Sequence, residues 1–600
     1  MSILQALASH YDRLVSKGDA PDYGYSQERI SFALVLSPEG DVVDVVDWRN
    51  VSLRRPRPRL CEVPRPDPSR TSTRVVSNFL WDKSAYVLGV KLERDTRQPI
   101  SADREHDAFR LFHDHLLTDA TDDGLKALRA FLGGWRASSH ATLPHAGDLL
   151  DANIVFQLDG ERRLIHQRPA ARRIWGDHLA SLDRRSEVCL VSGVSAPIER
   201  LHPKVKGVAG AQSSGAAIVS FNLDAFTSYG KEQGANAPVS KRAAFAYTAA
   251  LNSLLTPDRG RRIRVGDATT VFWADAPGDE AAASKAEDLF SMLADPPPTD
   301  EGEAAQVRGR LESVAAGQPI EVIAPEVNEH TRFYVLGLSP NAARLSIRFW
   351  FEDTIGAMAR RIGEHWGDLR LDPVPWVTAP AAWRLLYETA VQRKSENISP
   401  TLGGALMRAI LTGSRYPQSL LAAVIMRVRA DGAVTGVRAA IAKACVRRAE
   451  RLSNPNNTED RLVSLDRHSH NAAYNLGRLF AAYAYAEKSI ADRNATIRDK
   501  YAGSASATPR RVFPMLMRGY EHNRAALAKA SDGQKRSAGR RADREVGQIL
   551  ERLPGSEDLP ATLSLEDQAR FFVGYYHQET AFYTKTAPEA HQRDPVNSEE

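Results

Sequence analysis

Two histidine–aspartate pairs, seven residues apart, have the residue types and spacing that could do catalytic chemistry. They are His106–Asp107 and His113–Asp114, in the segment REHDAFRLFHDHLL. On a helix both pairs would share one face, and such side chains can hold a metal ion that activates water. A metal-dependent phosphohydrolase is therefore one hypothesis for this chain. The opposing interpretation is that these four are ordinary surface residues without a metal. Both pairs lie on one helix, and no distant residue stands out as a further metal ligand.

No other catalytic pattern is present in the sequence. It contains neither the GxSxG motif of a nucleophilic serine nor the HExxH motif of a zinc protease. Gly230-Lys231 is followed by Glu232, so the hydroxyl group that a phosphate-binding loop offers to magnesium is missing. The glycines between residues 207 and 215 do not follow the dinucleotide-binding order. We therefore expect a chain that is not an enzyme and that uses no metal or cofactor.

Loops rich in glycine, amide and hydroxyl side chains point instead to binding. Glycine lets a backbone approach a ligand closely, and amide and hydroxyl groups can hydrogen-bond to base edges and sugars. Such residues, with cations beside them, gather in residues 70–90 and 202–247. Ordinary surface loops would have a similar composition, so the two interpretations stay open. The candidate nucleic-acid-contact residues are Asn78, Lys83, Arg74, Lys204, Lys206, Gln212, Ser213, Ser214, Lys231, Gln233 and Asn236.

The positive charge of the chain is confined to its rear part. The net charge is +5, but residues 381–560 contain 30 Lys+Arg and 17 Asp+Glu, a local charge of +13. A confined excess in which arginine dominates suggests a polyanion partner. Two groups repeat at short spacings that put most members of each on one helix face. They are Arg438, Lys443, Arg447, Arg448 and Arg451, and then Arg536, Arg540, Arg541 and Arg544. The alternative is a solvated helical surface.

The elements that must position these residues are of two kinds. Hairpin patterns surround the turns Pro38–Asp41, Asp159–Gly160, Gly266–Asp267 and Ser339–Asn341, and helical patterns lie near residues 102–117, 123–137 and 241–255. After residue 378 the pattern is almost wholly helical. The sequence therefore predicts an α+β fold: an N-terminal domain, residues 1–370, with mainly antiparallel sheets, followed by an all-α helical bundle, residues 378–590.

Length, hydropathy and cysteine usage narrow the class of protein. Six hundred residues exceed what one core supports, so more than one domain is expected. No window approaches about 18 uncharged apolar residues, so we expect no membrane span. Cys61, Cys189 and Cys445 are scattered and form no CxxC pair, which suits the reducing cytoplasm. These features are typical of a soluble cytoplasmic protein.

Four segments, in order along the chain, carry a resemblance to a known family. They are SNFLWDKSAYVLG, KVKGVAGAQSSGAAIVSFNLDAFTSYGKEQGANAPVS, FYVLGLSPNAARLSIRFW and LLYETAVQRKSENISPTLGGALMRAILTGSRYPQSLL. Together they resemble the large subunit of the type I-C CRISPR Cascade complex, over essentially the whole chain. The resemblance implies a non-catalytic subunit that lies near the 5′ end of the CRISPR RNA, beside the backbone and crRNA-processing subunits.

The resemblance also implies what such a subunit does. It recognises a protospacer-adjacent motif (PAM) in double-stranded target DNA, promotes strand separation and R-loop formation, and supports recruitment of a helicase-nuclease. We expect Asn78, Gln212, Ser213 and Ser214 to read the PAM, and the helical domain to hold the displaced strand. The family also makes a separate small subunit by internal initiation. Since no methionine lies between Met426 and Met515, we expect initiation at another codon, near Val463 to Leu479.

Overall fold

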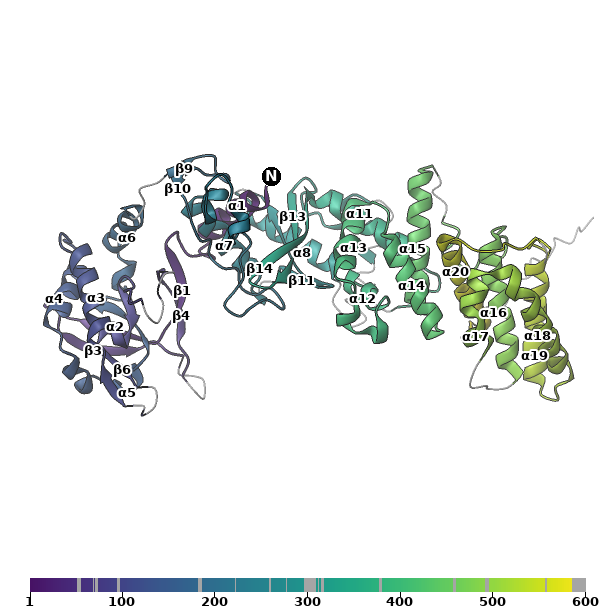
Figure 1. The fold of residues 1–600 in the computed structure, drawn as a ribbon, viewed down its shortest axis with the longest axis horizontal. Helices are drawn as coiled ribbons and strands as arrows, with labels where there is room; N and C mark the ends of the chain where they lie inside the picture. The colour runs from purple at the N-terminus through teal and green to yellow at the C-terminus, as the bar shows by residue number, and fades with distance from the viewer. Residues whose placement is uncertain are drawn as a thin grey trace, which may run out of the picture. The chain divides into compact units, whose positions relative to one another are not determined.

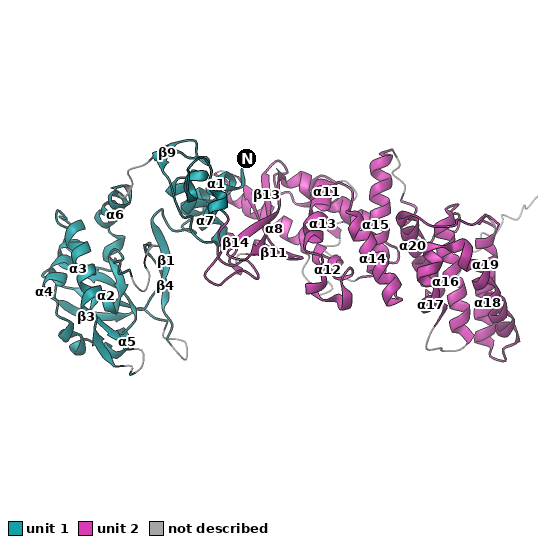
Figure 2. Cartoon of the chain, in the orientation of Figure 1, with its two compact units in different colours: residues 1–205, 219–253 teal, residues 206–218, 254–600 magenta. Residues whose placement is uncertain are grey.

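A computed structural model describes residues 1–584, apart from residues 51–55, 68–69, 71–73, 94–95, 97, 182–185, 222, 258–259, 277, 296–308, 311, 315–317, 377–379, 457–459, 491–495 and 556–557. The chain forms two compact units (Figure 2). The first contains Met1–Val205 and Val219–Ser253, and the second contains Lys206–Ile218 and Leu254–Glu600. The short segment 206–218 therefore belongs with the later part of the chain.

The first unit is built on a four-stranded sheet in the order β3-β2-β8-β5 (Figure 1). Its strands are β2 (Phe32–Leu36), β3 (Val42–Asp47), β5 (Trp81–Lys83) and β8 (Asn153–Leu158). β2 and β3 form the predicted first hairpin, and every residue of β2 is buried. β2 and β8 run parallel, whereas the other two pairs are antiparallel. Strands far apart in the sequence therefore meet at the centre of this sheet.

Helices cover the sheet and enclose an apolar core that includes Phe109, Phe131 and Phe156. The helices of this unit are α1 (Ile3–Ser16), α2 (Ser84–Val87), α3 (Asp103–Leu116), α4 (Asp123–Gly134), α5 (Ala146–Leu149), α6 (Pro169–Ser181) and α7 (Lys241–Leu254). Helices α3, α4 and α7 confirm the three helical segments predicted in this region. Short two-stranded ribbons complete the unit: β1 (Tyr25–Ile30) with β4 (Arg59–Pro64), β6 (Val90–Leu92) with β7 (Pro99–Ser101), and β9 (Ser186–Val188) with β10 (Ser195–Pro197).

The hairpin predicted around Asp159–Gly160 has its turn, but the predicted second strand does not form. After β8 the chain makes one isolated bridge, between Gln157 and Leu164, and then a 3-10 turn over Ile165–Gln167. Leu164, Ile165 and His166 are all buried. Three consecutive buried side chains do not suit an edge strand, whose side chains point alternately to opposite faces.

The second unit begins with an antiparallel sheet in the order β11-β12-β13-β14. The strands are β11 (Arg262–Val265), β12 (Ala268–Asp275), β13 (Arg332–Asn341) and β14 (Arg344–Thr354). They confirm the two hairpins predicted here, but the second turn lies at Ala342–Ala343, so Ser339–Asn341 belongs to β13. The turn contains Ala342 in the left-handed region (φ +53°), directly after the predicted turn residues Ser339–Asn341.

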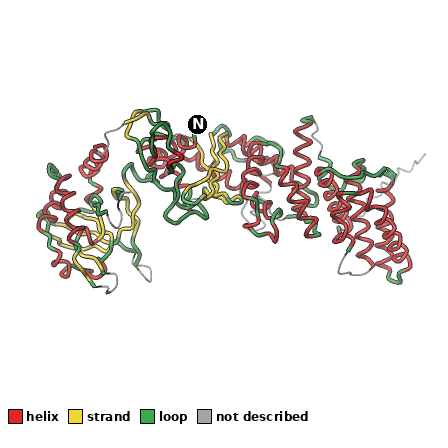
Figure 3. Tube along the Cα trace, viewed as in Figure 1, coloured by secondary structure: helices red, strands yellow, loops and turns green. Residues whose placement is uncertain are grey.

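Helices, joined by loops, follow the second sheet, and no strand occurs after β14 among the described residues (Figure 3). The helices nearest the sheet are α8 (Glu280–Ala294), α10 (Ile320–Ile323), α11 (Ile355–Leu369), α12 (Ala382–Tyr387), α13 (Pro400–Thr412), α14 (Gln418–Asp431) and α15 (Gly436–Ser453). The final group is α16 (Ala472–Ile490), α17 (Ile497–Ala507), α18 (Pro509–Lys529), α19 (Gly533–Leu550) and α20 (Leu565–Tyr583). The predicted α+β class is confirmed.

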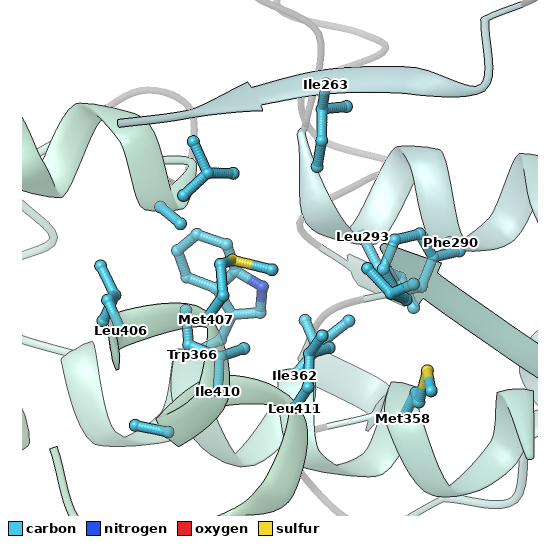
Figure 4. Close-up of a cluster of buried hydrophobic side chains, with 14 of the residues drawn as sticks. Ile263, Phe290, Leu293, Met358, Ile362, Trp366, Leu406, Met407, Ile410 and Leu411 are labelled. Atoms are coloured by element: carbon cyan, nitrogen blue, oxygen red, sulfur yellow. The ribbon is translucent and has the colours of Figure 1, made fainter. Parts of the chain in front are cut away.

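One apolar core joins the second sheet to the first helices of this group. Figure 4 shows Ile263 of β11 and Phe290 of α8 in the same cluster as Trp366 of α11 and Leu406 of α13. This core contains residues on both sides of residue 370, where the sequence suggested a boundary. A second core lies among α16–α20 and also takes side chains from α14 and α15.

Helices α16 and α20 cross closely through a pair of glycines. A Cβ on Gly477 would lie 1.8 Å from the carbonyl oxygen of Phe571, and a Cβ on Gly574 would lie 2.2 Å from that of Tyr474. Real Cβ atoms do not approach backbone so closely, so only glycine fits at either position. The crossing holds together the bundle of α16–α20, which includes the arginines of α19.

Candidate nucleic-acid interface

The histidine–aspartate pairs of α3 do not form a metal site. His113 is buried; its Nδ1 donates to the carbonyl oxygen of Phe109 (2.8 Å) and its Nε2 accepts from the backbone N–H of Leu80 (2.8 Å). Burial lowers the pKa of His113 to about 4, so the ring is neutral and both nitrogens are engaged. The phosphohydrolase hypothesis therefore loses its proposed ligand set.

The aspartates of the same set pair with cations. Asp107 and Asp114 both lie within ion-pair distance of Arg110, and Asp114 is also 3.9 Å from Arg129. Among the described residues, no group of three or more histidine, cysteine, aspartate or glutamate side chains is arranged to hold a metal ion. These carboxylates act as ordinary helix-surface charges.

The loop 206–218 presents the polar side chains that the sequence selected there. Lys206, Gln212, Ser213 and Ser214 are all exposed. The ends of the loop are fixed to the second sheet: Ala209 donates to Thr269 Oγ1 (3.0 Å), and Ala217 exchanges backbone hydrogen bonds with the β13–β14 turn region. The loop is thus an anchored segment that displays one amide and two hydroxyl groups to solvent.

In the first unit, the segment 228–236 is a turn held by the side chain of Asn236. The Oδ1 of Asn236 accepts from the N–H of Ser228 (3.2 Å), and its Nδ2 donates to the carbonyl oxygens of Lys231 (2.8 Å) and Gln233 (3.1 Å). The Oε1 atom of Gln233 is buried. Lys231 is exposed, as is Lys204 in the same unit. Asn236 and Gln233 therefore shape the turn, and Lys231 is displayed by it.

Asn78, the first of the predicted PAM-reading residues, is buried. It is 4% exposed, and its backbone N–H donates to the carboxylate of Asp82 (3.0 Å). Asp82 is itself buried and receives a two-pronged hydrogen bond from Arg70, which also lies over the ring of Tyr86. Lys83 and Arg74, in contrast, are exposed. The structure therefore does not display Asn78 to solvent as the predicted reading of a DNA groove requires, because Asp82 holds the segment inward.

The five cations of α15, which we call the α15 set, face the protein interior. Arg438, Lys443, Arg447 and Arg448 are buried, and Arg451 is partly so. Arg438 pairs with Glu388 and Asp431, and Arg451 with Glu364 and Asp368. Lys443 and Arg447 share Asp460. The prediction that this face is available to a phosphate backbone is therefore wrong.

Within the α15 set, Arg448, like Lys443, is completely buried. Its guanidinium donates to Asp368, to the carbonyl oxygens of Ala409 (3.1 Å) and Ser414 (3.2 Å), and to the hydroxyl of Tyr416 (3.2 Å). Burial raises the pKa of the Asp368 carboxyl, and the positive charges of Arg448 and Arg451 oppose that effect. Arg448 thus joins α15 to α11, to the end of α13 and to the loop after it.

The cations of α19, which we call the α19 set, are arranged differently. Arg536, Arg540 and Arg544 are exposed and spaced by four residues, so they form a stripe along one helix face. Neither Arg540 nor Arg544 has an ion-pair partner among the described residues. Arg541 points elsewhere: it donates to the carbonyl oxygens of Ala581 (2.6 Å) and Phe582 (2.8 Å) and so caps α20. Arg540 and Arg544 are therefore displayed to solvent, whereas Arg536 is exposed but also donates to the carbonyl oxygens of Ala530 and Ser531 (both 2.7 Å).

A comparison with protein-family models now identifies the kind of protein. Residues 7–583 match the model described as CRISPR-associated protein (Cas_Csd1). The chain belongs to this family. The match includes residues of both compact units and nearly all of the described structure. No curated protein matches the chain.

Two features of this Cas_Csd1 family member were missed in the sequence. Arg70 lies next to the predicted residues, but its ion pair with buried Asp82 depends on a fold that brings them together. Tyr229 stands in a Ser-Tyr-Gly-Lys stretch whose glycine signals a tight turn. That signal places the tyrosine at a tip, although it does not reveal how fully the ring is exposed.

No helix of the described residues is long and apolar enough to span a membrane.

Proposed function

We propose that this chain is the non-catalytic large subunit of a type I-C RNA-guided CRISPR complex. In this role it recognises a PAM in double-stranded DNA, promotes strand separation and R-loop formation, and supports recruitment of a helicase-nuclease. The observation that carries the proposal is the family match over residues 7–583. Its partners would be the CRISPR RNA, the backbone and crRNA-processing subunits, and a small subunit.

The anchored loop 206–218 supports PAM recognition. Its exposed side chains offer hydrogen-bond donors and acceptors on a glycine-rich backbone, which can enter a groove that bulky side chains cannot. Guide pairing carries most of the sequence information in such complexes, so the protein needs only a short readout and phosphate contacts. Gln212, Ser213 and Ser214 take the reading role in this proposal, and Lys206 takes a phosphate contact.

The exposed stripe of the α19 set supports a role in holding the displaced strand. Replacing the DNA duplex by the guide RNA–DNA duplex changes the free energy little. Modest contacts to the released DNA strand can therefore shift the equilibrium toward the open state. Arginines that neutralise phosphates release counterions and make binding strongly dependent on salt. Arg536, Arg540 and Arg544 take this role. The α15 set takes a structural role instead, because its members are buried and paired.

The C-terminal helices would also be made as a separate small subunit. Initiation between Val463 and Leu479 would retain most or all of α16 together with α17–α20. Such a product would lack the side chains that α14 and α15 contribute to the second core, among them Val428 and Val446. Intact-mass analysis of the purified complex tests this idea. A preparation without any fragment that lacks residues 1–450 would reject it.

The main experiment measures opening of duplexes whose flanking bases are randomised, with a complex assembled from the full-length chain. We expect one short motif to be preferred. Gln212→Ala should weaken discrimination at one motif position by about 1–3 kcal/mol, since a base-edge hydrogen bond is lost. Gln418→Ala, an exposed amide at the start of α14, is the matched control and should change nothing. A wild-type complex that opens every flank equally would overturn the proposed function, and an equal loss on all flanks would move Gln212 to a backbone contact.

A further inference from the structure

Tyr229 is the most exposed aromatic side chain among the described residues. It is 101% exposed, whereas Tyr583 and Tyr23, the next most exposed, are 59% and 36% exposed. Most other aromatic rings of the described chain lie in the cores. An aromatic ring left wholly in water contributes no burial energy to this fold, so the fold itself gives no reason for a tyrosine at this position.

The backbone at Tyr229 also argues against a structural reason for the tyrosine. Tyr229 has φ +51° and Gly230 has φ +70°, and Ser228 is bridged to Lys231 on either side of them. This is a two-residue turn with both central residues in the left-handed region, where Asn, Asp and Gly are preferred. A bulky residue in that region costs about 1–2 kcal/mol. The turn would therefore be more stable with another residue at position 229.

The turn is nevertheless held rigidly. Three hydrogen bonds from the Asn236 side chain tie together Ser228, Lys231 and Gln233. Behind the turn, Gly234 donates to the carbonyl oxygen of Arg200 (3.2 Å). A Cβ on Gly234 would lie 2.5 Å from the carbonyl oxygen of Glu199, so glycine lets this segment seat against the chain beneath it. The result is a fixed tip with one ring projecting from it.

We propose that Tyr229 is a base-stacking residue, and that it packs on a nucleobase at the junction between paired and separated strands. This proposal rests on the proposed function and names a residue that acts in it. Every nucleobase offers a flat face, and stacking on an aromatic side chain is independent of sequence. Because the backbone of the tip is already held by hydrogen bonds, it loses little conformational entropy when the ring stacks. Lys231, exposed in the same turn, contacts a neighbouring phosphate.

The surroundings of Tyr229 favour a nucleic acid over a protein partner. The residues around the tip are Thr227, Ser228, Gly230, Lys231 and Glu232, all polar or glycine. An aromatic anchor in a protein interface normally lies among other contacts that exclude water from it. A lone ring on a narrow two-residue tip has no such surroundings, whereas insertion beside a base pair requires a narrow tip.

The test uses a complex assembled from the full-length chain and a duplex with 2-aminopurine at the first pair beside the preferred flank. Tyr229→Asn removes the ring and suits the left-handed turn, so folding is preserved. We expect it to slow opening about 5- to 150-fold, the range that loss of one stacked base gives. Tyr229→Phe keeps the ring and should remain within about twofold of wild type. Tyr583→Asn, at the end of α20, is the control for loss of an exposed tyrosine and should have no effect.

A second substrate separates stacking from binding. In a duplex whose first pair is already mismatched, the Tyr229→Asn complex should recover most of the wild-type rate. Equal slowing on both substrates, or no slowing on either, would overturn the proposal. Failure of Tyr229→Asn to assemble with the other subunits would also overturn it, because the ring would then contact protein. If the wild-type complex prefers no flank at all, the proposed function fails, and that result is separate from the behaviour of the variant.

Discussion

The two arginine-rich sets of the second unit have similar spacing in the sequence but opposite places in the fold. In the α15 set, Arg438, Lys443 and Arg448 are buried and paired with carboxylates. In the α19 set, Arg540 and Arg544 lie on an exposed face without partners among the described residues. The difference shows that cation spacing along a helix predicts a shared face, but not which side of the molecule that face is on.

The acidic partners explain the difference. Asp368, Glu364 and Glu388 come from α11 and from the end of α12, well before α15 in the chain. Asp431 and Asp460, in contrast, lie close to α15 in the sequence. The cations of α15 are therefore paired by both distant and nearby carboxylates. On α19 itself, Asp543 pairs with Arg524 of α18 and not with the arginines of the stripe. The local charge of residues 381–560 therefore overstates the exposed positive charge.

The largest expected effect follows from the buried pair of Arg448 and Asp368. Arg448→Met should lower the free energy of unfolding by about 3–5 kcal/mol, because Asp368 would remain buried without its main partner. Chemical denaturation followed by circular dichroism measures this change. Arg544→Met, on the exposed stripe, is the matched control and should stay within about 0.5 kcal/mol of wild type.

A double variant sharpens the same comparison. When Asp368→Leu is added to Arg448→Met, most of the lost stability should return, since a buried ion pair can be replaced by apolar side chains at little cost. An Arg448→Met protein as stable as the wild type would show that Arg448 does not hold α15 to α11. The interior assignment of the α15 set would then be wrong.

Local patterns predicted most of the fold, because the signals for helices and hairpins lie within short stretches. The segments that became α3, α4 and α7, and the hairpins around Pro38–Asp41 and Gly266–Asp267, all have such signals. The hairpin after β8 was mispredicted because burial of residues 164–166 is decided by the core. The core that joins the second sheet to α13 depends on contacts between distant segments, which no local pattern reveals.

The candidate site was less predictable than the fold. Gln212, Ser213 and Ser214 lie in an exposed loop, as their composition suggested, but Asn78 is drawn inward by Asp82. Asn236 and Gln233 are polar residues of the right type, but the Asn236 side chain is used within the turn and the Oε1 atom of Gln233 is buried. Residue type can nominate a DNA contact, whereas exposure depends on neighbours that only the fold supplies.

An intermediate effect is expected from pH, through a histidine beside the α15 set. His365 of α11 is buried, hydrogen-bonds to Tyr416, and burial together with the charge of Arg448 lowers its pKa to about 3. The unfolded chain therefore binds this proton first as pH falls below about 6.5, and stability is lost progressively between pH 6.5 and 3. Denaturation at a series of pH values should show this loss. Uptake of one proton by His365 on unfolding lowers the free energy of unfolding by about 1.4 kcal/mol for each pH unit of acidification.

The variant His365→Asn isolates that proton. Its amide can still accept a hydrogen bond from Tyr416, so the pH slope should become shallower by one proton even if stability at neutral pH is reduced. His522→Asn, on the exposed side of α18, should leave the slope unchanged. If the slope in His365→Asn were unchanged, His365 would be accessible to protons in the folded protein. Water would then reach the interior around His365 and Arg448.

The smallest effect on stability, and the one closest to function, concerns the exposed stripe. Arg540→Gln and Arg544→Gln should each raise stability slightly, by about 0.2–0.5 kcal/mol, because like charges four residues apart repel. Each should also reduce the salt dependence of binding to a single-stranded oligonucleotide by about 0.7 in the slope of log K against log salt, the value for one phosphate contact. Fluorescence anisotropy of the full-length chain at several salt concentrations measures that slope.

Arg541→Gln provides the contrast within the same helix. Because Arg541 caps the end of α20, its loss should lower stability and leave the salt slope unchanged. If all three variants changed the slope equally, the net charge of α19 would matter more than the geometry of its stripe. If neither Arg540→Gln nor Arg544→Gln changed it, the stripe would be a solvated surface, and exposure would be no better a guide to DNA contact than the spacing that misled for α15.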